Sequence, residues 1–312
     1  MNTKTNSNKI GYLGPEGSFS YEAIVLLNLS HNATIVPFGS ISEVIQNTQN
    51  EKVQFGLVPI ENSIEGGVPE TLDQLLFHSE LFIQKDFILD IHQHLQTITE
   101  VRLSEIKEVV SYPHATAQCR QWLNKHLPNA KITASNSTSE ASKFVAESQS
   151  RHLAAIAPES AAKLFNLTIL RSKIEDHHDN QTKFVMVTKD KIPNMSGNDR
   201  TTIACFQHSD KPGSLHSIVG KFSARGINLT KLESRPTKKK LGQYCFIIEF
   251  EGHIQNPVIA DCLMDLHTEL ASLKFLGSYP THSLESIKKA NSQSWDIAQS
   301  WLDSLVKKVQ KH

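Results

Sequence analysis

The amino-acid sequence predicts an α/β fold of two lobes, followed by a smaller α+β domain. Through the first part of the chain, short apolar runs typical of strands alternate with amphipathic segments typical of helices. This alternation is the pattern of a parallel sheet covered by helices on both faces. A loop at residues 189–199, rich in polar residues, proline and glycine, then precedes a strand–helix–strand–strand–helix–strand order. The loop is therefore the predicted domain boundary.

The first lobe begins with a strand at residues 9–13, which ends in the turn Gly14-Pro15-Glu16-Gly17. Ser18 follows and can cap the next helix, because a serine hydroxyl accepts hydrogen bonds from the free N–H groups of a first helical turn. The other predicted elements of this lobe are a strand at residues 34–37, a helix at 41–47 and a strand at 55–60.

A second unit repeats this pattern and predicts the second lobe. Its helix at residues 115–127 places Cys119, Trp122, Leu123 and Leu127 on one face. A capping box, Ser137-Thr138-Ser139-Glu140, opens another helix. The strands lie at residues 106–111, 131–134 and 153–157, with 87–96 crossing between the lobes and 184–187 ending this part of the chain.

The α+β domain has its clearest signal in a helix with Leu215, Ile218, Val219 and Phe222 at i, i+3, i+4 and i+7. A second helix is predicted at residues 259–270, and strands at 201–207, 228–234, 243–250 and 275–279. The C-terminal segment beyond residue 280 is either an amphipathic helix, packed on the rest of the protein or on a partner subunit, or a loosely attached tail. Its apolar residues at helical spacing are Trp295, Ala298, Leu302, Leu305 and Val309.

The composition is that of a globular protein without a dominant charge. Lysine plus arginine and aspartate plus glutamate both number 32, so no global field favours nucleic acid or an anionic membrane. The beginning of the chain lacks the apolar stretch of a signal peptide, and no apolar run approaches the ~18 residues of a membrane helix. The four cysteines are widely spaced and form no C-x-x-C pair, which predicts reduced thiols in a cytoplasmic protein.

Histidine spacing does not predict a metal site. His92 and His94 share one face of a predicted strand, and His177 and His178 lie in a polar loop. Two ligands leave a coordination shell incomplete, so we expect no bound metal.

Three polar motifs are candidates for chemistry. The first, Gly11-x-x-Gly14-x-x-Gly17, lacks the spacing of a dinucleotide-binding loop and is either a plain turn or an anion site at a helix N-terminus. The second, Glu61-Asn62-Ser63, ends a strand, where α/β sheets place ligands. Helix capping by Asn62 or Ser63 is the alternative, but it leaves Glu61 unexplained. The third, Asp176-x-x-x-Asn180-x-Thr182-Lys183-Phe184, brings a hydroxyl and a cation to the start of a strand.

In sequence order, these motifs resemble those of the prephenate dehydratase family. The matching segments of the catalytic part are residues 12–20 (YLGPEGSFS), 58–63 (VPIENS), 111–119 (SYPHATAQC) and 176–184 (DHHDNQTKF). Residues 212–215 (PGSL) and 227–236 (INLTKLESRP) are similar to the ACT domain that these enzymes carry. The resemblance covers about residues 9–280.

Five positions depart from the family pattern. Lys183 stands where the family has arginine, and a lysine cannot make the planar pair of hydrogen bonds that arginine makes with a carboxylate. The loss of one such hydrogen bond costs roughly 1.5–3 kcal/mol, or about 10- to 150-fold in binding or rate. The five are Lys183 for arginine, Tyr112 for histidine, His114 for glutamine, Thr116 for leucine and Ser214 for alanine.

The resemblance implies a catalytic domain at residues 9–189 with two lobes like those of periplasmic binding proteins, built on doubly wound sheets, the second lobe at about 90–167. An ACT domain of ferredoxin-like βαββαβ order is implied at residues 199–280, and a helical tail at 281–312. The implied activity is the decarboxylative dehydration of prephenate to phenylpyruvate in L-phenylalanine biosynthesis, without cofactor or metal. L-phenylalanine is the implied effector, and a homodimer or homotetramer is expected.

The resemblance also implies roles for individual residues. Thr182 would act on the leaving ring hydroxyl as donor or proton relay, Glu61 is a candidate acid, and Asn62 completes the catalytic set. Lys183 would anchor a substrate carboxylate. The remaining candidates are Ser18, Ser111, Gln118 and Phe184 for substrate binding, and Gly213, Ser214, Leu215, Glu233, Ser234 and Arg235 for the effector.

Two alternatives remain at this point. The first is an arogenate dehydratase, whose substrate carries an amine in place of the keto group. The second is a non-enzymatic amino-acid sensor, which the altered motif at residues 111–119 and Lys183 favour, whereas Glu61, Asn62 and Thr182 favour an enzyme.

Overall fold

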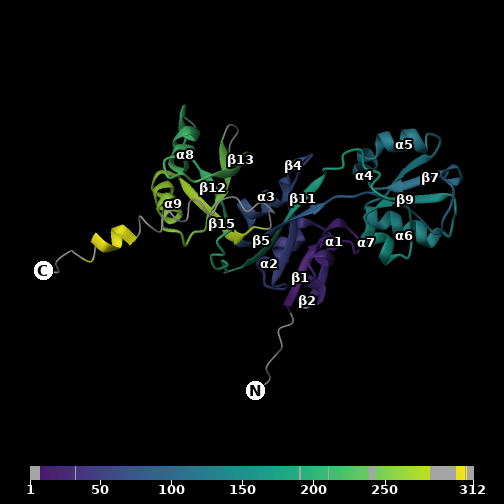
Figure 1. Ribbon diagram of the computed structural model, residues 1–312, viewed down its shortest axis with the longest axis horizontal. Helices are drawn as coiled ribbons and strands as arrows, with labels where there is room; N and C mark the ends of the chain where they lie inside the picture. The colour runs from purple at the N-terminus through teal and green to yellow at the C-terminus, as the bar shows by residue number, and fades with distance from the viewer. Residues whose placement is uncertain are drawn as a thin grey trace, which may run out of the picture. The chain divides into compact units, whose positions relative to one another are not determined.

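The fold is seen in a computed structural model that describes residues 8–31, 33–189, 191–209, 211–238, 243–281, 300–305 and 307. Residues 1–281 form one compact unit, and residues 282–312 form a second. The first unit contains three β-sheets, two in the α/β part and one in the C-terminal domain (Figure 1). The predicted limits of the domains stay a prediction.

The first lobe is built on a sheet of strand order β2-β1-β3-β11-β5, with β4 paired to β3. Strands β1, β2 and β3 are parallel, as predicted, but β11 runs antiparallel to both β3 and β5. The sheet is mixed because β5 leads the chain out to the second lobe and β11 brings it back. The elements are β1 (Asn8–Leu13), α1 (Phe19–Leu26), η1 (Leu29–His31), β2 (Ala33–Phe38), α2 (Ile41–Gln49), β3 (Phe55–Asn62), β4 (Gly66–Gly67), α3 (Pro69–Asp73), η2 (Gln74–His78), β5 (Leu81–Asp90) and β11 (Gln181–Lys189).

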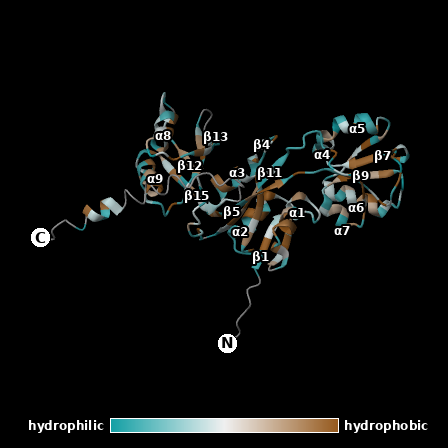
Figure 2. Cartoon of the chain, viewed as in Figure 1, coloured by the Kyte–Doolittle hydropathy of each residue, from teal (hydrophilic) through white to brown (hydrophobic). Residues whose placement is uncertain are grey.

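The second lobe is built on a sheet of order β10-β6-β9-β7-β8. Helices α4 and α5 cover one face and α6 the other, and hydrophobic residues are concentrated in the strands between them (Figures 1 and 2). The elements are β6 (His94–Thr97), η3 (Leu103–Glu105), β7 (Glu108–Ser111), α4 (Pro113–Gln118), α5 (Arg120–His126), β8 (Lys131–Ala134), α6 (Thr138–Ser148), β9 (Leu153–Ala157), α7 (Glu159–Leu164) and β10 (Thr168–Arg171).

Two crossing segments connect the lobes. Residues 91–93 lead from β5 to β6, and residues 172–180 lead from β10 back to β11. The segments are hydrogen-bonded to each other, from Ile91 N to Asn180 O (2.8 Å) and from Ile174 N to Gln93 O (2.9 Å). The predicted two-lobed architecture is confirmed, and the paired crossings lie between the two sheets.

The C-terminal domain has an antiparallel sheet of order β13-β14-β12-β15 and the predicted βαββαβ sequence of elements. Helices α8 and α9 bury one face of this sheet. The opposite face shares a hydrophobic core with the first lobe, in which Ala204, Cys245 and Tyr279 pack with residues of α2, α3 and β11. The elements are β12 (Asp199–Phe206), α8 (Ser214–Ser223), β13 (Leu229–Pro236), β14 (Tyr244–Glu251), α9 (Pro257–Glu269) and β15 (Ser272–Pro280).

In the second unit, residues 300–305 are helical and include Leu302 and Leu305 of the predicted amphipathic tail. Trp295, Ala298 and Val309 of that prediction lie outside the described residues. Over the described part of the chain, no helix combines the length and the apolar character of a membrane span.

Candidate active site

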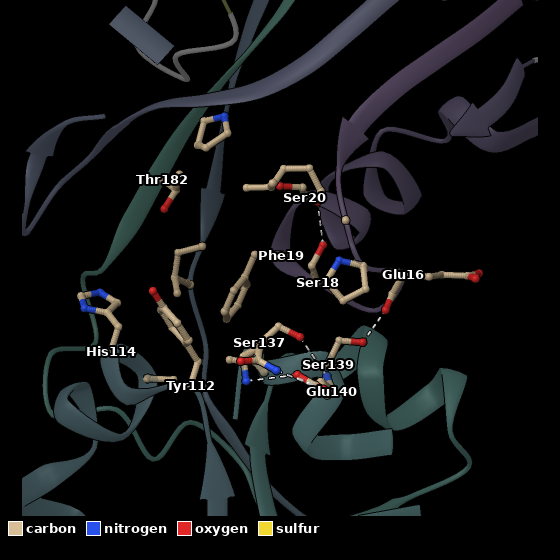
Figure 3. A pocket seen from close by; sticks show the side chains of 18 of the residues that line it. Glu16, Ser18, Phe19, Ser20, Tyr112, His114, Ser137, Ser139, Glu140 and Thr182 are labelled. Atoms are coloured by element: carbon tan, nitrogen blue, oxygen red, sulfur yellow. Dashed lines mark hydrogen bonds between the residues drawn. The ribbon is translucent and has the colours of Figure 1, made fainter. Parts of the chain in front are cut away.

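A cleft of about 1100 Å³ lies between the two lobes (Figure 3). Its walls come from the turn after β1, from the ends of β3 and β11, and from the first turns of α4 and α6. The crossing segments contribute Gln93 and Asn180. Segments that are far apart in the sequence therefore converge on one cavity, which has the size of a small-molecule site.

Asn62 and Thr182 lie side by side in the cleft, because β3 and β11 are paired with these two residues opposite each other. Asn62 Nδ2 donates to Thr182 Oγ1 (3.0 Å) and to Asn180 Oδ1 (2.8 Å). Within the described residues, no acceptor takes the hydroxyl proton of Thr182, and Figure 3 shows this hydroxyl pointing into the cavity. Thr182 can therefore donate a hydrogen bond to a ligand.

The turn after Asn62 brings a second group to the cleft. Asn62 Oδ1 accepts from the backbone N–H groups of Ile64 and Glu65 (2.9 and 3.1 Å). Glu65 Oε1 then lies 2.9 Å from Nε2 of His114, which belongs to the second lobe. The same imidazole nitrogen is 2.8 Å from the Gln118 amide nitrogen, and Gln118 Oε1 accepts from Gln93 (3.2 Å). A chain of polar groups thus crosses the cleft floor from one lobe to the other.

The glycine turn forms another contact between the lobes. Ser18 caps α1 by accepting from Tyr21 N (3.3 Å), as predicted for this helix. Gly17 has φ +80°, and a Cβ there would lie 2.8 Å from Ser139 Oγ and 3.3 Å from the Ala161 backbone. Ser139 also donates to the carbonyl of Glu16. The glycine is needed for its conformation and for this close approach of the second lobe.

Glu61 and Lys183 do not line the cleft, although both were predicted to act there. Side chains alternate along a strand, so each of these residues faces away from its neighbour, Asn62 or Thr182. Glu61 Oε2 lies 3.1 Å from Lys231 Nζ of β13, and Lys183 Nζ lies 2.5 Å from Glu249 Oε2 of β14. Neither the assignment of Glu61 as the acid nor that of Lys183 as the carboxylate anchor fits this geometry.

Lys183 instead belongs to a buried charge cluster between the first lobe and the C-terminal sheet. The side chains of Lys183, Asp86 and Glu249 are 11%, 3% and 7% exposed, and Arg200 NH1 lies 3.2 Å from Glu249 Oε1. The cluster also includes Tyr279, whose hydroxyl donates to Glu249 (3.1 Å). Burial raises the pKa of the Glu249 carboxyl, but Lys183 outweighs this and holds that pKa below its ordinary value.

The other predicted substrate residues divide into two groups. Ser18, Gln118 and Phe184 line the cleft, and the Phe184 ring stacks on Phe87 with ring centres 5.4 Å apart. Ser111 is fully buried and donates to the Ile156 carbonyl (2.6 Å), so it holds β7 to β9 and is outside the cleft.

The predicted effector residues lie in two elements of the C-terminal domain. Gly213 has φ +86° and precedes α8, which begins with Ser214 and Leu215. Strand β13 carries Glu233, Ser234 and Arg235. Because side chains alternate along a strand, Glu233 and Arg235 both face the first lobe.

Glu233 and Arg235 both contact the first lobe. Arg235 Nη2 lies 2.9 Å from Asp73 Oδ1, and the Glu233 carboxylate packs against Gly67. Arg235 Nε is buried and has no hydrogen-bond partner within the described residues.

Across the described ranges, no group of three or more His, Cys, Asp or Glu side chains is arranged to hold a metal ion. His92, one of the histidines considered as a metal ligand, instead pairs through Nδ1 with Glu175 Oε1 (2.8 Å).

Asn180 also lines the cleft, although it was not among the predicted site residues. The motif at residues 176–184 contains it as a fixed position, but the motif alone does not show where its side chain lies. Its burial (1% exposed) and its place in the cleft wall emerge only from the pairing of the crossing segments.

Comparisons with known proteins identify the family of this chain. The family model for prephenate dehydratase matches residues 10–192, and that for the ACT domain matches residues 201–268. A prephenate dehydratase of Bacillus subtilis is 34% identical over 285 residues, which span 88% of this chain and 100% of the relative.

Solved structures agree as well. The structure of a prephenate dehydratase in complex with L-Phe from Arthrobacter aurescens matches with a TM-score of 0.85 at 34% identity, over 96% of this chain and 99% of that chain. A structure described as GqqA, a novel type of quorum quenching acylases, matches with a TM-score of 0.77 at 25% identity. The match covers 88% of this chain and 98% of that chain. The fold thus also occurs in a protein described by another activity, so the family assignment rests on the matched family model and the identities. The chain belongs to the prephenate dehydratase family and is a carbon–oxygen lyase of phenylalanine biosynthesis.

Proposed function

We propose that the cleft between the lobes binds prephenate, in preference to arogenate, and that Thr182 assists the departure of the ring hydroxyl. The preference for prephenate is supported by the relatives that are described as prephenate dehydratases. The role of Thr182 is supported by the 3.0 Å contact from Asn62 Nδ2 to Thr182 Oγ1. Because Asn62 is the donor in this contact, the Thr182 hydroxyl is left to donate its own proton toward the substrate. Asn62 is then a positioning residue for Thr182.

The reaction breaks two bonds and completes an aromatic ring. The carbon–carbon bond to the ring carboxylate breaks, carbon dioxide leaves, and its electron pair enters the ring. The carbon–oxygen bond to the ring hydroxyl breaks with its electrons on oxygen, which takes up one proton and leaves as water. Aromatisation drives the reaction, so the protein has to orient the substrate and stabilise the departing oxygen.

We propose that His114 and Lys143 take over the electrostatic role expected of Lys183. Prephenate carries two carboxylates, and among the described residues that line the cleft, His114 and Lys143 are the side chains able to carry positive charge. Both come from the second lobe, opposite Thr182 in the first. This separation supports an orientation in which the hydroxyl faces Thr182 and a carboxylate faces the second lobe.

We expect the purified protein to form phenylpyruvate from prephenate without added metal and in the presence of a chelator. Turnover of prephenate and arogenate should be compared in parallel by following each aromatic product, and kcat/KM should be higher for prephenate. A higher kcat/KM for arogenate would reverse the proposed substrate preference. Turnover that is lost on chelation and restored by zinc would mean that a metal takes part in the reaction.

We also propose that L-phenylalanine binds the C-terminal domain and changes catalysis. The domain matches the ACT family, and the relative from Arthrobacter aurescens was solved with L-Phe bound. One local feature supports a site for an amino acid, namely the free N–H groups where α8 begins at Gly213. Strand β13 also contacts the strand that carries Asn62, through Lys231 and Glu61.

Phenylalanine at saturation is expected to shift turnover several-fold, because allosteric coupling is typically ~1–3 kcal/mol. Gly213→Val should blunt this shift and leave unregulated turnover near normal, since a β-branched residue is strained at φ +86°. Arg235→Ala should also blunt it. The matched control is Gly220→Ala in α8, where a Cβ meets nothing within 4 Å. Calorimetry that detects no phenylalanine binding up to millimolar concentration would rule out this regulation.

The assembly and the location of the protein stay predictions. A homodimer or homotetramer is expected, and sedimentation of the purified protein tests it. The four cysteines are buried and unpaired, which supports a cytoplasmic protein.

A further inference from the structure

Glu65 and His114 meet across the cleft and join the two lobes. Glu65 lies in the turn after β3 of the first lobe, and His114 lies in the first turn of α4 in the second lobe. Glu65 Oε1 is 2.9 Å from His114 Nε2. The two side chains are 53% and 43% exposed and both line the cleft, so a ligand there can reach them. The pair is therefore both a contact between the lobes and a part of the binding surface.

The Glu65 carboxylate is held by His114 alone. Within the described residues, no other side chain or backbone group contacts this carboxylate as a donor. The backbone N–H of Glu65 donates to Asn62 Oδ1 (3.1 Å), which fixes the turn but not the side chain. By contrast Glu140, another acidic residue of the cleft wall, accepts from Asn136 N and Asn136 Nδ2 (3.1 and 3.3 Å). Glu65 can thus turn into water without breaking a second hydrogen bond.

His114 cannot serve Glu65 and a substrate carboxylate through the same nitrogen. An imidazole nitrogen carries one proton, and one carboxylate accepts it at a time. Two carboxylates beside one imidazole also repel each other. The side-chain amide of Gln118 lies 2.8 Å from the same nitrogen, so the ring keeps a neighbour that holds its orientation when Glu65 turns away.

We propose that Glu65 competes with a substrate carboxylate for His114 and is displaced when prephenate binds. This inference rests on the proposed function, in which His114 and Lys143 receive the carboxylates of prephenate. The contact is autoinhibitory: Glu65 weakens substrate binding, but it has already left His114 in the enzyme–substrate complex. It should therefore raise KM and leave kcat unchanged.

Removal of the competitor tests this directly. Glu65→Ala is expected to lower KM for prephenate by about two- to fivefold with kcat unchanged, in keeping with the modest strength of an exposed ion pair. Steady-state kinetics measures both constants, and thermal unfolding shows whether the variant is folded. Glu159→Gln is the matched control, because Glu159 is 50% exposed and lies 2.8 Å from Lys163 but does not line the cleft. It should keep KM.

The same substitution in a His114→Ala background separates the contact from a general effect of charge. His114→Ala alone should raise KM, and adding Glu65→Ala should then change KM no further, because the group in dispute is gone. An unchanged or raised KM for Glu65→Ala in the original protein would overturn the proposal. An equal decrease of KM in both backgrounds would also overturn it, since simple repulsion of an anion would suffice. Prephenate turnover by the unmodified protein stands in each of these cases, whereas its absence would reject the proposed function itself.

Discussion

Replacing Thr182 by alanine is expected to lower kcat for prephenate by about 10²- to 10⁴-fold, with little change in KM. The Thr182 hydroxyl is held by Asn62 and aimed into the cleft, so its hydrogen bond to the substrate strengthens as charge develops on the departing oxygen. Steady-state kinetics with prephenate, followed by the formation of phenylpyruvate, measures both constants. Thr182→Ser keeps a hydroxyl and should retain much more of the activity than Thr182→Ala.

A second threonine of the same strand gives a matched control. Thr188 also lies in β11 and is buried, but its hydroxyl donates to the Gln54 carbonyl (2.7 Å), and it does not line the cleft. Thr188→Ala should cost about 1 kcal/mol of stability and leave kcat near normal. If Thr182→Ala instead raised KM and left kcat intact, Thr182 would be a binding residue without a part in the chemical step.

Lys183→Met is expected to destabilise the folded protein by about 3–5 kcal/mol, the usual cost of removing one partner from a buried ion pair. Lys183 Nζ is 2.5 Å from Glu249 and 3.3 Å from Asp86, and both carboxylates are almost fully buried. Without the lysine, Arg200 is left beside two buried negative charges. Urea denaturation gives the free energy of unfolding. Lys183→Arg keeps the cation and should remain close to the original stability.

Lys163→Met is the matched control for the removal of a lysine. Lys163 pairs with Glu159 at 2.8 Å, but the two side chains are 74% and 50% exposed. Exposed pairs contribute only about 0–1 kcal/mol. Equal effects of the two substitutions would mean that the buried cluster does not stabilise the fold. A lowered KM for prephenate in Lys183→Arg, without change in stability, would favour the anchor role that the resemblance implies.

The stabilisation by this cluster should also depend on pH. The pKa of Glu249 is lower in the folded protein than its ordinary value. A carboxyl of this kind contributes stability above its unfolded pKa, and that contribution is lost as the pH falls through the folded value. Lys183→Met should therefore differ most from the unmodified protein near neutral pH, and the difference should shrink in acid.

Much of the fold could be predicted because its signals are local. Strand–helix alternation identifies the parallel strands β1, β2 and β3, and the helical stripe from Leu215 to Phe222 identifies α8. The position of β11 could not be predicted in this way. Thr182 pairs with Asn62, which lies far back in the sequence, and the intervening second lobe hides this partnership from any local pattern.

The candidate site shows the same division between local and long-range information. Motif order identified Asn62 and Thr182 as neighbours in function, but it assigned Glu61 and Lys183 to the same cleft. Strand alternation already separates Glu61 from Asn62 and Lys183 from Thr182, so the two residues of each pair face opposite sides of the sheet. The face that carries Glu61 and Lys183 contacts the C-terminal sheet. This contact depends on how the domains dock, which the sequence does not reveal.

The most direct test of this active site is a crystal structure with hydrogenated prephenate, whose saturated ring keeps the hydroxyl and both carboxylates but cannot become aromatic. The ring oxygen is expected within hydrogen-bond distance of Thr182 Oγ1, with a carboxylate toward His114 and Lys143. Lys183 and Glu61 should keep their contacts with Glu249 and Lys231. A carboxylate bound to Lys183, or a ring oxygen that does not contact Thr182, would contradict this arrangement.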